Sequence, residues 1–347
     1  MSTMRDVAGL AGVSGKTVSR VINGDKYVSA AVQERVQRVI LELKYVPNML
    51  SQTFRNGRDS AIGIAVPDIA DPFFGAVIQA VADQARTRST AVLVTSLGSD
   101  PDDEQPSVEA LLRRHIAGLI LAPTSTDQEY IKGWQQHTEV IFIDRPPRRV
   151  TADSVVEDDF GAAVTAVAHL LERGHRRIAF IGNRSAVVTT GRRLDGYRAA
   201  LIAAGIAPDP VLEALHEESG CDAVGSLRSI LALPDPPTAI FSSNSQSSIA
   251  MVPQLHEQRR TDVAFISFGD FPMAGALKPA VTVLDQNPGL LGSTAAQRLF
   301  RRIDQPGLKL RRQIVLPVEL RIRESSGVPV DPSRSNGATR TRVAVNG

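Results

Sequence analysis

The chain has 347 residues, of which 43% are hydrophobic and 22% charged, and this suits two or three domains with buried cores. A single cysteine, Cys221, excludes an internal disulfide framework and a zinc site built from cysteines. No apolar run reaches the roughly 18 residues of a membrane span, and the first residues lack the apolar stretch of a signal peptide. We therefore expect a cytoplasmic protein.

The net charge of +2 is unevenly distributed along the chain. Residues 1–58 carry nine Lys and Arg against four Asp and Glu, and residues 328–347 carry three against one. The remaining residues 59–327 carry 27 against 32. A basic head on an acidic body indicates that the head alone has an anionic partner.

The first 46 residues predict a small helical domain. Residues 4–11 have helical composition and stop at Gly12, and Ser14 can cap a second helix that runs to about Ile22. A third helix follows Ser29, which can cap it. Its apolar positions step by four, four and three, as one face of a helix requires: Val32, Val36, Ile40 and Leu43.

The first two helices fit a helix-turn-helix. Gly12 lies in the turn, where a positive φ costs glycine nothing, and Val18 faces inward. The start of the second helix leaves several small or polar residues outward, where a recognition helix meets bases and phosphates. They are Gly15, Lys16, Thr17, Ser19 and Arg20. Spacing alone leaves a second interpretation open, a three-helix bundle whose polar face is merely solvated.

Several motifs in this head resemble the headpiece of the lac repressor (LacI) family of bacterial regulators. They are Asp6-Val7-Ala8, Ala11-Gly12-Val13-Ser14, the run from Thr17 to Asn23, and Tyr45-Val46-Pro47-Asn48. The resemblance covers roughly residues 3–324. It implies a DNA-binding repressor without enzymatic activity, cofactor or metal, which binds a near-palindromic operator as a homodimer and responds to a small carbohydrate-type effector.

The resemblance also implies a set of DNA contacts in residues 1–46. Gly15 and Lys16 occupy the two positions that usually set operator preference. Gly15 has no side chain to read a base, so specificity there would rest either on Lys16, which could donate to guanine, or on close approach of the backbone. The full set is Thr3, Ser14, Gly15, Lys16, Thr17, Ser19, Arg20, Asn23, Tyr27, Ser29 and Tyr45.

Residues 47–58 are expected to form a hinge. A segment this short is a marginal helix by itself. In the family it becomes helical when two copies meet over the minor groove, where a leucine wedges between base pairs. Phe54 stands at that leucine position here, and Ser51 replaces a usual small alanine. Alternatively, Phe54 packs against the body of the protein.

The body alternates β-branched runs with helical stretches, which favours parallel sheets with helices on both faces. The predicted strands are 61–66, 91–95, 118–122, 140–143, 177–181, 239–241, 263–267 and 281–284. The predicted helices are 74–88, 160–173, 192–204, 246–257 and 290–303. The number of predicted strands is larger than one sheet usually contains. We therefore predict an α/β core of two doubly wound subdomains with a ligand between them.

The resemblance implies a periplasmic-binding-protein-like core over residues 59–327. One subdomain would comprise about 60–158 and 288–314, and the other about 159–284 and 315–324. Residues 328–347 are rich in Pro, Ser, Gly and Arg and lack a leucine heptad. We expect a disordered tail there, and therefore a dimer and not a tetramer.

The resemblance implies a set of residues that line the effector cleft, most of them in loops that follow predicted strands. The candidates are Asp71, Phe73, Arg145, Arg193, Asn244, Asp270 and Gln286. Arg193 matches the family's effector-gripping arginine, and a guanidinium fork can hold an anion or paired hydroxyls. Asp71 can equally cap the next helix, and the Asp144-Arg145 pair can be an ordinary surface ion pair.

Two positions that are usually acidic in the family hold Ser245 and Gly269 in this chain. Fewer carboxylates beside Arg145 and Arg193 would lower the cost of binding an anion. From the sequence we therefore expect an acidic effector, such as a sugar acid or a sugar phosphate, in preference to a neutral sugar. A solute-binding sensor without operator binding is the alternative function, and an enzyme is disfavoured because no phosphate-binding glycine motif follows a strand.

Overall fold

A computed structural model describes residues 3–22, 25, 27–43, 45, 61–184, 187–216 and 221–327. The chain divides into two units, a headpiece up to Asp59 and a core from Ser60 onward. Several predictions lie outside the described residues: Asn23, the hinge with Ser51 and Phe54, and the tail from residue 328. Among the described residues, no helix combines the length and apolar composition that crossing a bilayer requires.

The headpiece has three helices in its described part, α1 (Met4–Ala11), α2 (Gly15–Ile22) and α3 (Ala30–Glu42). Helix α1 begins at a capping box between Thr3 and Asp6. It ends at Gly12, whose φ of 60° is the left-handed conformation that glycine adopts readily. The small core that holds the helices together is Val7, Ala8, Ala11, Val18, Val21, Val36, Val39 and Tyr45.

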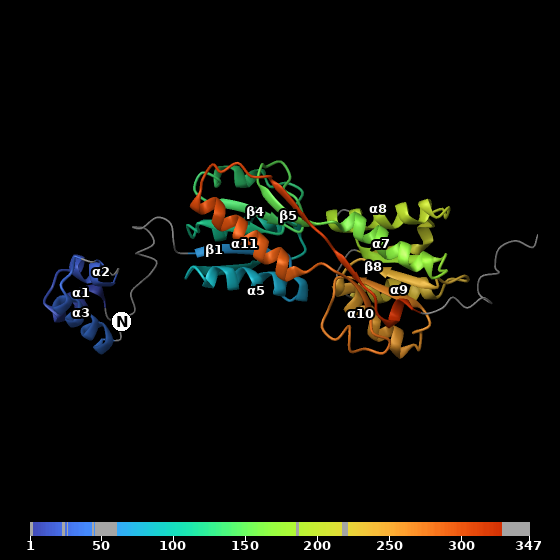
Figure 1. The fold of residues 1–347 in the computed structure, drawn as a ribbon, viewed down its shortest axis with the longest axis horizontal. Helices are drawn as coiled ribbons and strands as arrows, with labels where there is room; N and C mark the ends of the chain where they lie inside the picture. The colour runs from blue at the N-terminus through green and yellow to red at the C-terminus, as the bar shows by residue number, and fades with distance from the viewer. Residues whose placement is uncertain are drawn as a thin grey trace, which may run out of the picture. The chain divides into compact units, whose positions relative to one another are not determined.

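The described core contains two six-stranded sheets (Figure 1). The first has the order β11-β5-β4-β3-β1-β2 and is parallel throughout. Its strands are β1 (Ala61–Val66), β2 (Ala91–Ser96), β3 (Gly118–Leu121), β4 (Glu139–Ile143), β5 (Asp153–Glu157) and β11 (Gln313–Leu316).

The second sheet has the order β12-β10-β9-β8-β6-β7, and β12 runs antiparallel to β10 at its edge. Its strands are β6 (Ile178–Asn183), β7 (Glu213–His216), β8 (Ala239–Ser242), β9 (Ala264–Phe268), β10 (Thr282–Asp285) and β12 (Glu319–Arg321). The sequence prediction did not include β5, β7, β11 and β12, which are short and lie toward or at the sheet edges.

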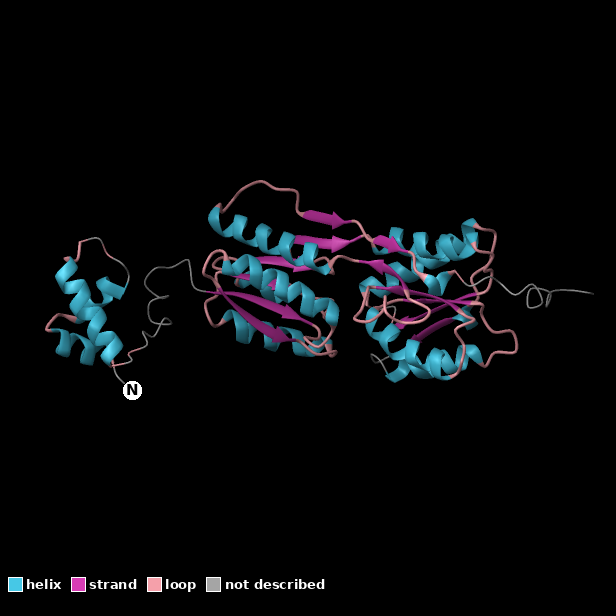
Figure 2. Cartoon of the chain, turned by 60° about the horizontal axis from the view of Figure 1, so that its bottom comes forward, coloured by secondary structure: helices cyan, strands magenta, loops and turns pink. Residues whose placement is uncertain are grey.

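Helices cover both faces of each sheet, which explains why the central strands are buried on both sides (Figure 2). In the first lobe α5 (Pro72–Arg86) and α11 (Pro288–Asp304) pack on one face and α6 (Glu104–Leu112) on the other. In the second, α7 (Asp159–Glu172) and α8 (Val188–Ala203) oppose α9 (Cys221–Leu231) and α10 (Ser245–Glu257). Short 3-10 turns lie at 101–103, 129–133, 210–212 and 324–326.

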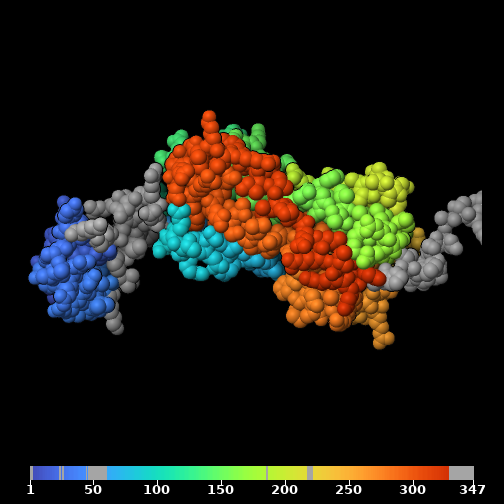
Figure 3. Space-filling model, viewed as in Figure 1, coloured from blue at the N-terminus to red at the C-terminus, as the bar shows by residue number. Residues whose placement is uncertain are grey.

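The described chain crosses between the lobes three times: after β5, after β10 and after β11. The last crossing follows Leu316, so β11 lies wholly in the first lobe, although the expected boundary fell at residue 314. The final segment, red in Figure 3, runs over the surface of both lobes. Because the parallel strands of both lobes end toward these crossings, the loops after them meet between the lobes.

Candidate functional site

Helix α2 presents a polar face that the headpiece core leaves free. Val18 and Val21 are buried, whereas Gly15, Lys16 and Arg20 are exposed on the outer side. Arg20 approaches Asp25 at 3.5 Å and keeps half of its side chain accessible. A short amphipathic helix with exposed cations near its start can enter the major groove. The structure thus brings Gly15, Lys16, Thr17, Ser19 and Arg20 onto one helix.

The hydroxyl residues of the headpiece also have structural roles. Thr3 Oγ1 accepts from the Asp6 amide, and Ser14 Oγ accepts from the Thr17 amide at 3.1 Å. Ser29 precedes α3 as its cap residue, without a side-chain hydrogen bond. Thr3, Ser14 and Ser29 remain exposed, so capping and contact with phosphate are compatible at these positions.

The two tyrosines predicted to contact DNA differ in environment. Tyr27 is 95% exposed, and its side chain is available to a partner. Tyr45 is only 9% exposed and packs with the valines of the headpiece core. The ring of Tyr45 therefore belongs to the core of the three-helix domain, together with Val36 and Val39 of α3, and its contact with DNA stays a prediction.

A polar cleft lies between the two lobes of the core. Its inner chamber, of about 120 Å³, is lined from the first lobe by Asp68, Asp71, Phe73, Phe74, Asp144 and Arg145. Lining residues from or near the second lobe include Asn183, Thr190, Arg193, Asn244, Gln246 and Gln286. An outer chamber of about 370 Å³ adjoins it and shares Asp68, Arg145 and Gln246. Six of the seven predicted effector residues thus meet in one cavity.

Arg193 is a buried arginine at the second-lobe wall of the cleft. Its Nε lies 2.7 Å from Asp159 Oδ1, and its Nη1 donates to the Ser243 carbonyl at 2.6 Å. The guanidinium carbon lies 3.6 Å from the centre of the Phe268 ring, a cation–π contact. Arg193 is therefore already neutralised by protein groups, and only part of its fork faces the cavity.

Arg145 forms part of the opposite wall. Its Nη1 donates to the Pro123 carbonyl at 2.7 Å. Its Nε lies 3.1 Å from Asp144 Oδ2, yet the angle leaves this buried donor without a hydrogen bond. A buried donor without an acceptor is costly, so Arg145 Nε favours a ligand oxygen in the cleft.

Asp71 has both of the roles that the sequence left open. Its carboxylate accepts from the Phe73 amide at 2.9 Å and caps α5, while the same side chain lines the inner chamber. Burial raises the pKa of Asp71 to about 6, with a further contribution from Asp68 and Asp144. Across the cleft, Gln246 Nε2 donates to Asp68 Oδ2 at 3.0 Å and links the two lobes.

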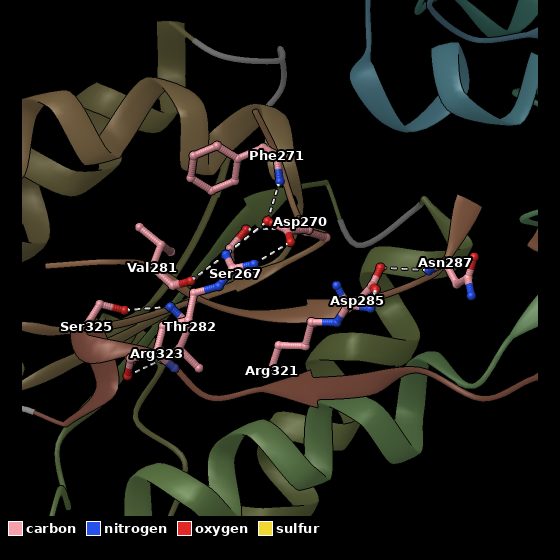
Figure 4. A network of polar contacts seen from close by, with 11 residues as sticks. Ser267, Asp270, Phe271, Val281, Thr282, Asp285, Asn287, Arg321, Arg323 and Ser325 are labelled. Atoms are coloured by element: carbon pink, nitrogen blue, oxygen red, sulfur yellow. Dashed lines mark hydrogen bonds and ion pairs between the residues drawn. The ribbon is translucent and has the colours of Figure 1, made fainter. Parts of the chain in front are cut away.

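Asp270 does not line the inner chamber with the other predicted effector residues. Its carboxylate pairs with Arg323, with Nη2 2.6 Å from Oδ2 (Figure 4). It lies in a neighbouring depression that Phe73 and Gln286 also line. The same region contains an ion pair between Arg321 and Asp285. Asp270 therefore fixes the C-terminal segment, and the sequence could not reveal this because Arg323 lies 53 residues away.

Buried carboxylates gather where the chain first crosses between the lobes. Glu157 ends β5, and its Oε1 lies 3.5 Å from Gln286 Nε2, while Oε2 has no hydrogen-bond partner among the residues that the structure describes. Burial, together with Asp144 and Asp159, raises the pKa of Glu157 well above its usual range, although Arg193 opposes this shift. Burial also raises the pKa of Asp159 to about 6. The raised pKa favours the neutral, protonated form of Glu157 at this buried position.

The predicted effector set omitted seven polar residues that line the cleft: Asp68, Asp144, Asn183, Thr189, Thr190, Ser245 and Gln246. Asp68 and Asp144 lie just beyond β1 and β4, and Asn183 ends β6, so the rule that ligands bind at carboxyl ends of strands would have found these three. Thr190 and Gln246 lie in the first turns of α8 and α10, where no sequence signal separates them from capping residues.

A helix-turn-helix headpiece joined to a two-lobed α/β core with a polar cleft defines a ligand-responsive DNA-binding regulator. Residues 3–48 match the model of bacterial regulatory proteins of the lacI family, and residues 167–326 match that of a periplasmic-binding-protein-like domain. The ribose operon repressor of Escherichia coli K12 is 30% identical over 326 residues, covering 92% of this chain and 98% of that protein. The chain belongs to the LacI family of transcriptional regulators, which is not a family of enzymes.

Solved structures agree with this assignment and confirm the predicted fold class. The lac repressor dimer bound to operator and an anti-inducer has a TM-score of 0.82 and 26% identity, covering 94% of this chain and 99% of that one. A LacI-family regulator from Enterococcus faecium with bound ribose has a TM-score of 0.70 and 25% identity, covering 76% and 98%.

Proposed function

We propose that this protein is a repressor that binds a near-palindromic operator as a homodimer, with α2 of each subunit in the major groove. The observation that carries this proposal is the amphipathic character of α2: Val18 and Val21 are buried in the headpiece core, whereas Lys16 near the start of the helix is exposed. The lac repressor dimer on its operator supports the same arrangement for this chain. Two-fold pairing of subunits would place two headpieces on two half-sites.

Footprinting of the full-length protein on the intergenic DNA upstream of its own gene tests this proposal. We expect a protected two-fold symmetric site and an affinity that falls steeply with salt, because phosphate contacts release counterions. A sensor without DNA function would give no protection and no salt-dependent shift.

We propose further that the effector is a neutral sugar, such as the ribose bound by the similar regulator from Enterococcus faecium. This replaces the hypothesis of an acidic effector, which rested on two unopposed arginines. Arg193 is paired with Asp159 and Arg145 lies against Asp144, while Asp68 and Asp71 add two more carboxylates to the lining. Sugar hydroxyls can donate to these carboxylates, whereas an anion would be repelled by them.

The remaining lining also suits a sugar. Phe73 and Phe74 meet edge to face at 5.0 Å and offer an apolar surface to a ring, and the amides of Asn183 and Gln246 offer both donors and acceptors. At Gly269, whose φ is +92°, an added Cβ would lie 3.1 Å from Gln286 Oε1. Gln286 thus occupies the space that a side chain at position 269 would need.

Calorimetry with ribose, ribonate and ribose 5-phosphate, on the wild type and Asp71→Asn, distinguishes neutral from anionic ligands. Asparagine still caps α5, so the fold is preserved. We expect ribose to bind the wild type and to lose about tenfold in affinity in the variant, because one charge-assisted hydrogen bond is weakened. An anionic ligand would instead bind the variant more tightly. Asp100→Asn, at the exposed cap of the 101–103 turn, is the matched control and should change nothing.

A further inference from the structure

The end of the first lobe opposite the cleft carries a dense cluster of cations. Four segments lead into the amino ends of β2, β3, β4 and β11: 86–90, 113–117, 134–138 and 301–312. Because these strands are parallel, their amino ends share one edge of the sheet. We name these segments the basal loops. Figure 1 shows the end of α11 and the start of β1 at this same end of the lobe.

Charge is strongly segregated into the basal loops. They hold nine Lys and Arg and one Asp, whereas the rest of residues 59–327 holds 18 Lys and Arg against 31 Asp and Glu. The rest of the body is thus acidic in sum, whereas the basal loops are strongly basic. The nine cations are Arg86, Arg88, Arg113, Arg114, Arg301, Arg302, Lys309, Arg311 and Arg312.

Neighbouring carboxylates neutralise only part of this charge. Three of the cations form ion pairs: Arg86 with Asp83, Arg88 with Asp304, and Arg113 with Glu109. Buried Asp153 accepts from Arg302 and lies 3.7 Å from Arg312, which stays mostly exposed. Four exposed cations form no ion pair or hydrogen bond within the described residues: Arg114, Arg301, Lys309 and Arg311.

We infer that the basal loops bind the sugar–phosphate backbone of DNA and add a sequence-independent contribution to operator binding. This rests on the proposed operator binding and extends it from the headpiece to the core. β1 begins at the basal edge, and only residues 46–60 separate it from Tyr45 of the headpiece. Fifteen residues span at most about 50 Å, and this tether length is compatible with one duplex meeting both the headpiece and the basal loops.

The composition of the basal loops fits a phosphate backbone better than a protein partner. Among the described residues, none of the large hydrophobic side chains that are exposed belongs to these loops. Protein interfaces depend on buried aromatic or aliphatic anchors, whereas phosphate contacts need only accessible guanidinium and ammonium groups. Eight of the nine cations are arginines, which bind phosphate oxygens in a bidentate manner.

The test compares two triple variants of the full-length protein on an operator duplex and on a non-operator duplex of equal length. The basal variant is Arg114→Gln/Arg301→Gln/Arg311→Gln. The matched control removes three exposed arginines from the second lobe, Arg173→Gln/Arg228→Gln/Arg259→Gln. Binding is measured by fluorescence anisotropy over a range of salt concentrations, and thermal melting checks that each variant folds.

We expect the affinity of the basal variant to fall about tenfold, and by the same factor for the operator and the non-operator duplex. Its plot of log K against log salt should be shallower by at least about 2, since each phosphate contact contributes about 0.9 to the slope. The control variant should match the wild type. The inference is overturned by an unchanged basal variant, by a loss confined to the operator, or by an equal loss in the control. Failure of the proposed function would appear separately, as a wild type that does not prefer the operator.

Discussion

The two functional surfaces of this protein are built in opposite ways. On α2 the side chains that would contact DNA project into solvent from a single helix, and apart from Arg20 their charge is not compensated nearby. In the cleft the functional side chains come from loops after several strands and are buried against one another, as Arg193 is against Asp159 and Phe268. The DNA-binding surface thus comes from one helix and is exposed to solvent. The cleft comes from several segments, and its side chains are already paired with one another.

This difference predicts a separation of effects. Changes on α2 should alter recognition and leave stability intact, because solvent already surrounds the side chains. Changes in the cleft should alter stability and recognition together, because removing one member of a buried pair leaves the other uncompensated.

The largest effect is expected for Arg193→Met. The substitution leaves Asp159 buried without its cation and removes the contact with Phe268. We expect the free energy of unfolding of the core to fall by about 3–5 kcal/mol in chemical denaturation. Arg192→Met, at the exposed neighbouring position, should stay within about 0.5 kcal/mol of the wild type. A loss below 1 kcal/mol for Arg193→Met would show that the pair is not needed for stability.

Lys16→Ala should give the opposite pattern. Losing a base contact is expected to cost about 1–3 kcal/mol in operator binding, roughly a tenfold to hundredfold loss, and to spare non-operator DNA. The melting temperature should not change, since Lys16 is exposed. Arg38→Ala, on the exposed side of α3, serves as the control for charge. Equal losses on both kinds of DNA would reassign Lys16 to phosphate binding.

The pH dependence of stability tests the buried carboxylates at the crossing. Glu157 has a raised pKa in the folded core, so the folded state holds its proton at pH values where the unfolded chain releases it. Its stabilising contribution is complete below the ordinary pKa near 4.5 and is lost as the pH rises toward the folded value. Glu157→Gln should therefore match the wild type near pH 4.5 and become progressively more stable than it at higher pH.

Glu129→Gln provides a control of opposite sign for this titration. The Lys132 ion pair lowers the pKa of Glu129, so its small contribution to stability is present above pH 4.5 and is lost at lower pH. Urea denaturation of both variants from about pH 3 to 8.5 covers both titrations, because the contribution of Glu129 is lost below pH 4.5 and that of Glu157 above it. A Glu157→Gln curve parallel to that of the wild type would mean that Glu157 is not protonated in the folded core.

The smallest effect on recognition is expected for Asp270→Ala. Because Asp270 pairs with Arg323 outside the inner chamber, its loss should lower stability by about 1 kcal/mol and leave sugar affinity within twofold. Gln286→Ala, inside the chamber, is the comparison variant and should weaken sugar binding. Sugar affinity that falls in both variants by a similar factor would return Asp270 to the effector site.

The contrast between the surfaces also explains how much the sequence could predict. The face of α2 follows from helical periodicity and one turn at Gly12, which are short-range properties. Placing Asp71, Arg145 and Asn244 in the cleft follows from their positions after strands. Side-chain pairing does not follow from the sequence, because Asp159 meets Arg193 and Arg323 meets Asp270 only after the lobes have folded. This is why the sequence alone favoured an acidic effector and included Asp270.

The central claim is that a neutral sugar in the cleft controls operator binding by the headpiece. The most direct measurement is the ribose affinity of the full-length protein, by calorimetry, with and without saturating operator, together with the operator affinity with and without saturating ribose. Linkage requires the two ratios to be equal. We predict a common factor that differs clearly from one for ribose and no binding of ribose 5-phosphate. Operator affinity that is unaffected by bound ribose, or binding of the phosphorylated sugar alone, would contradict the account.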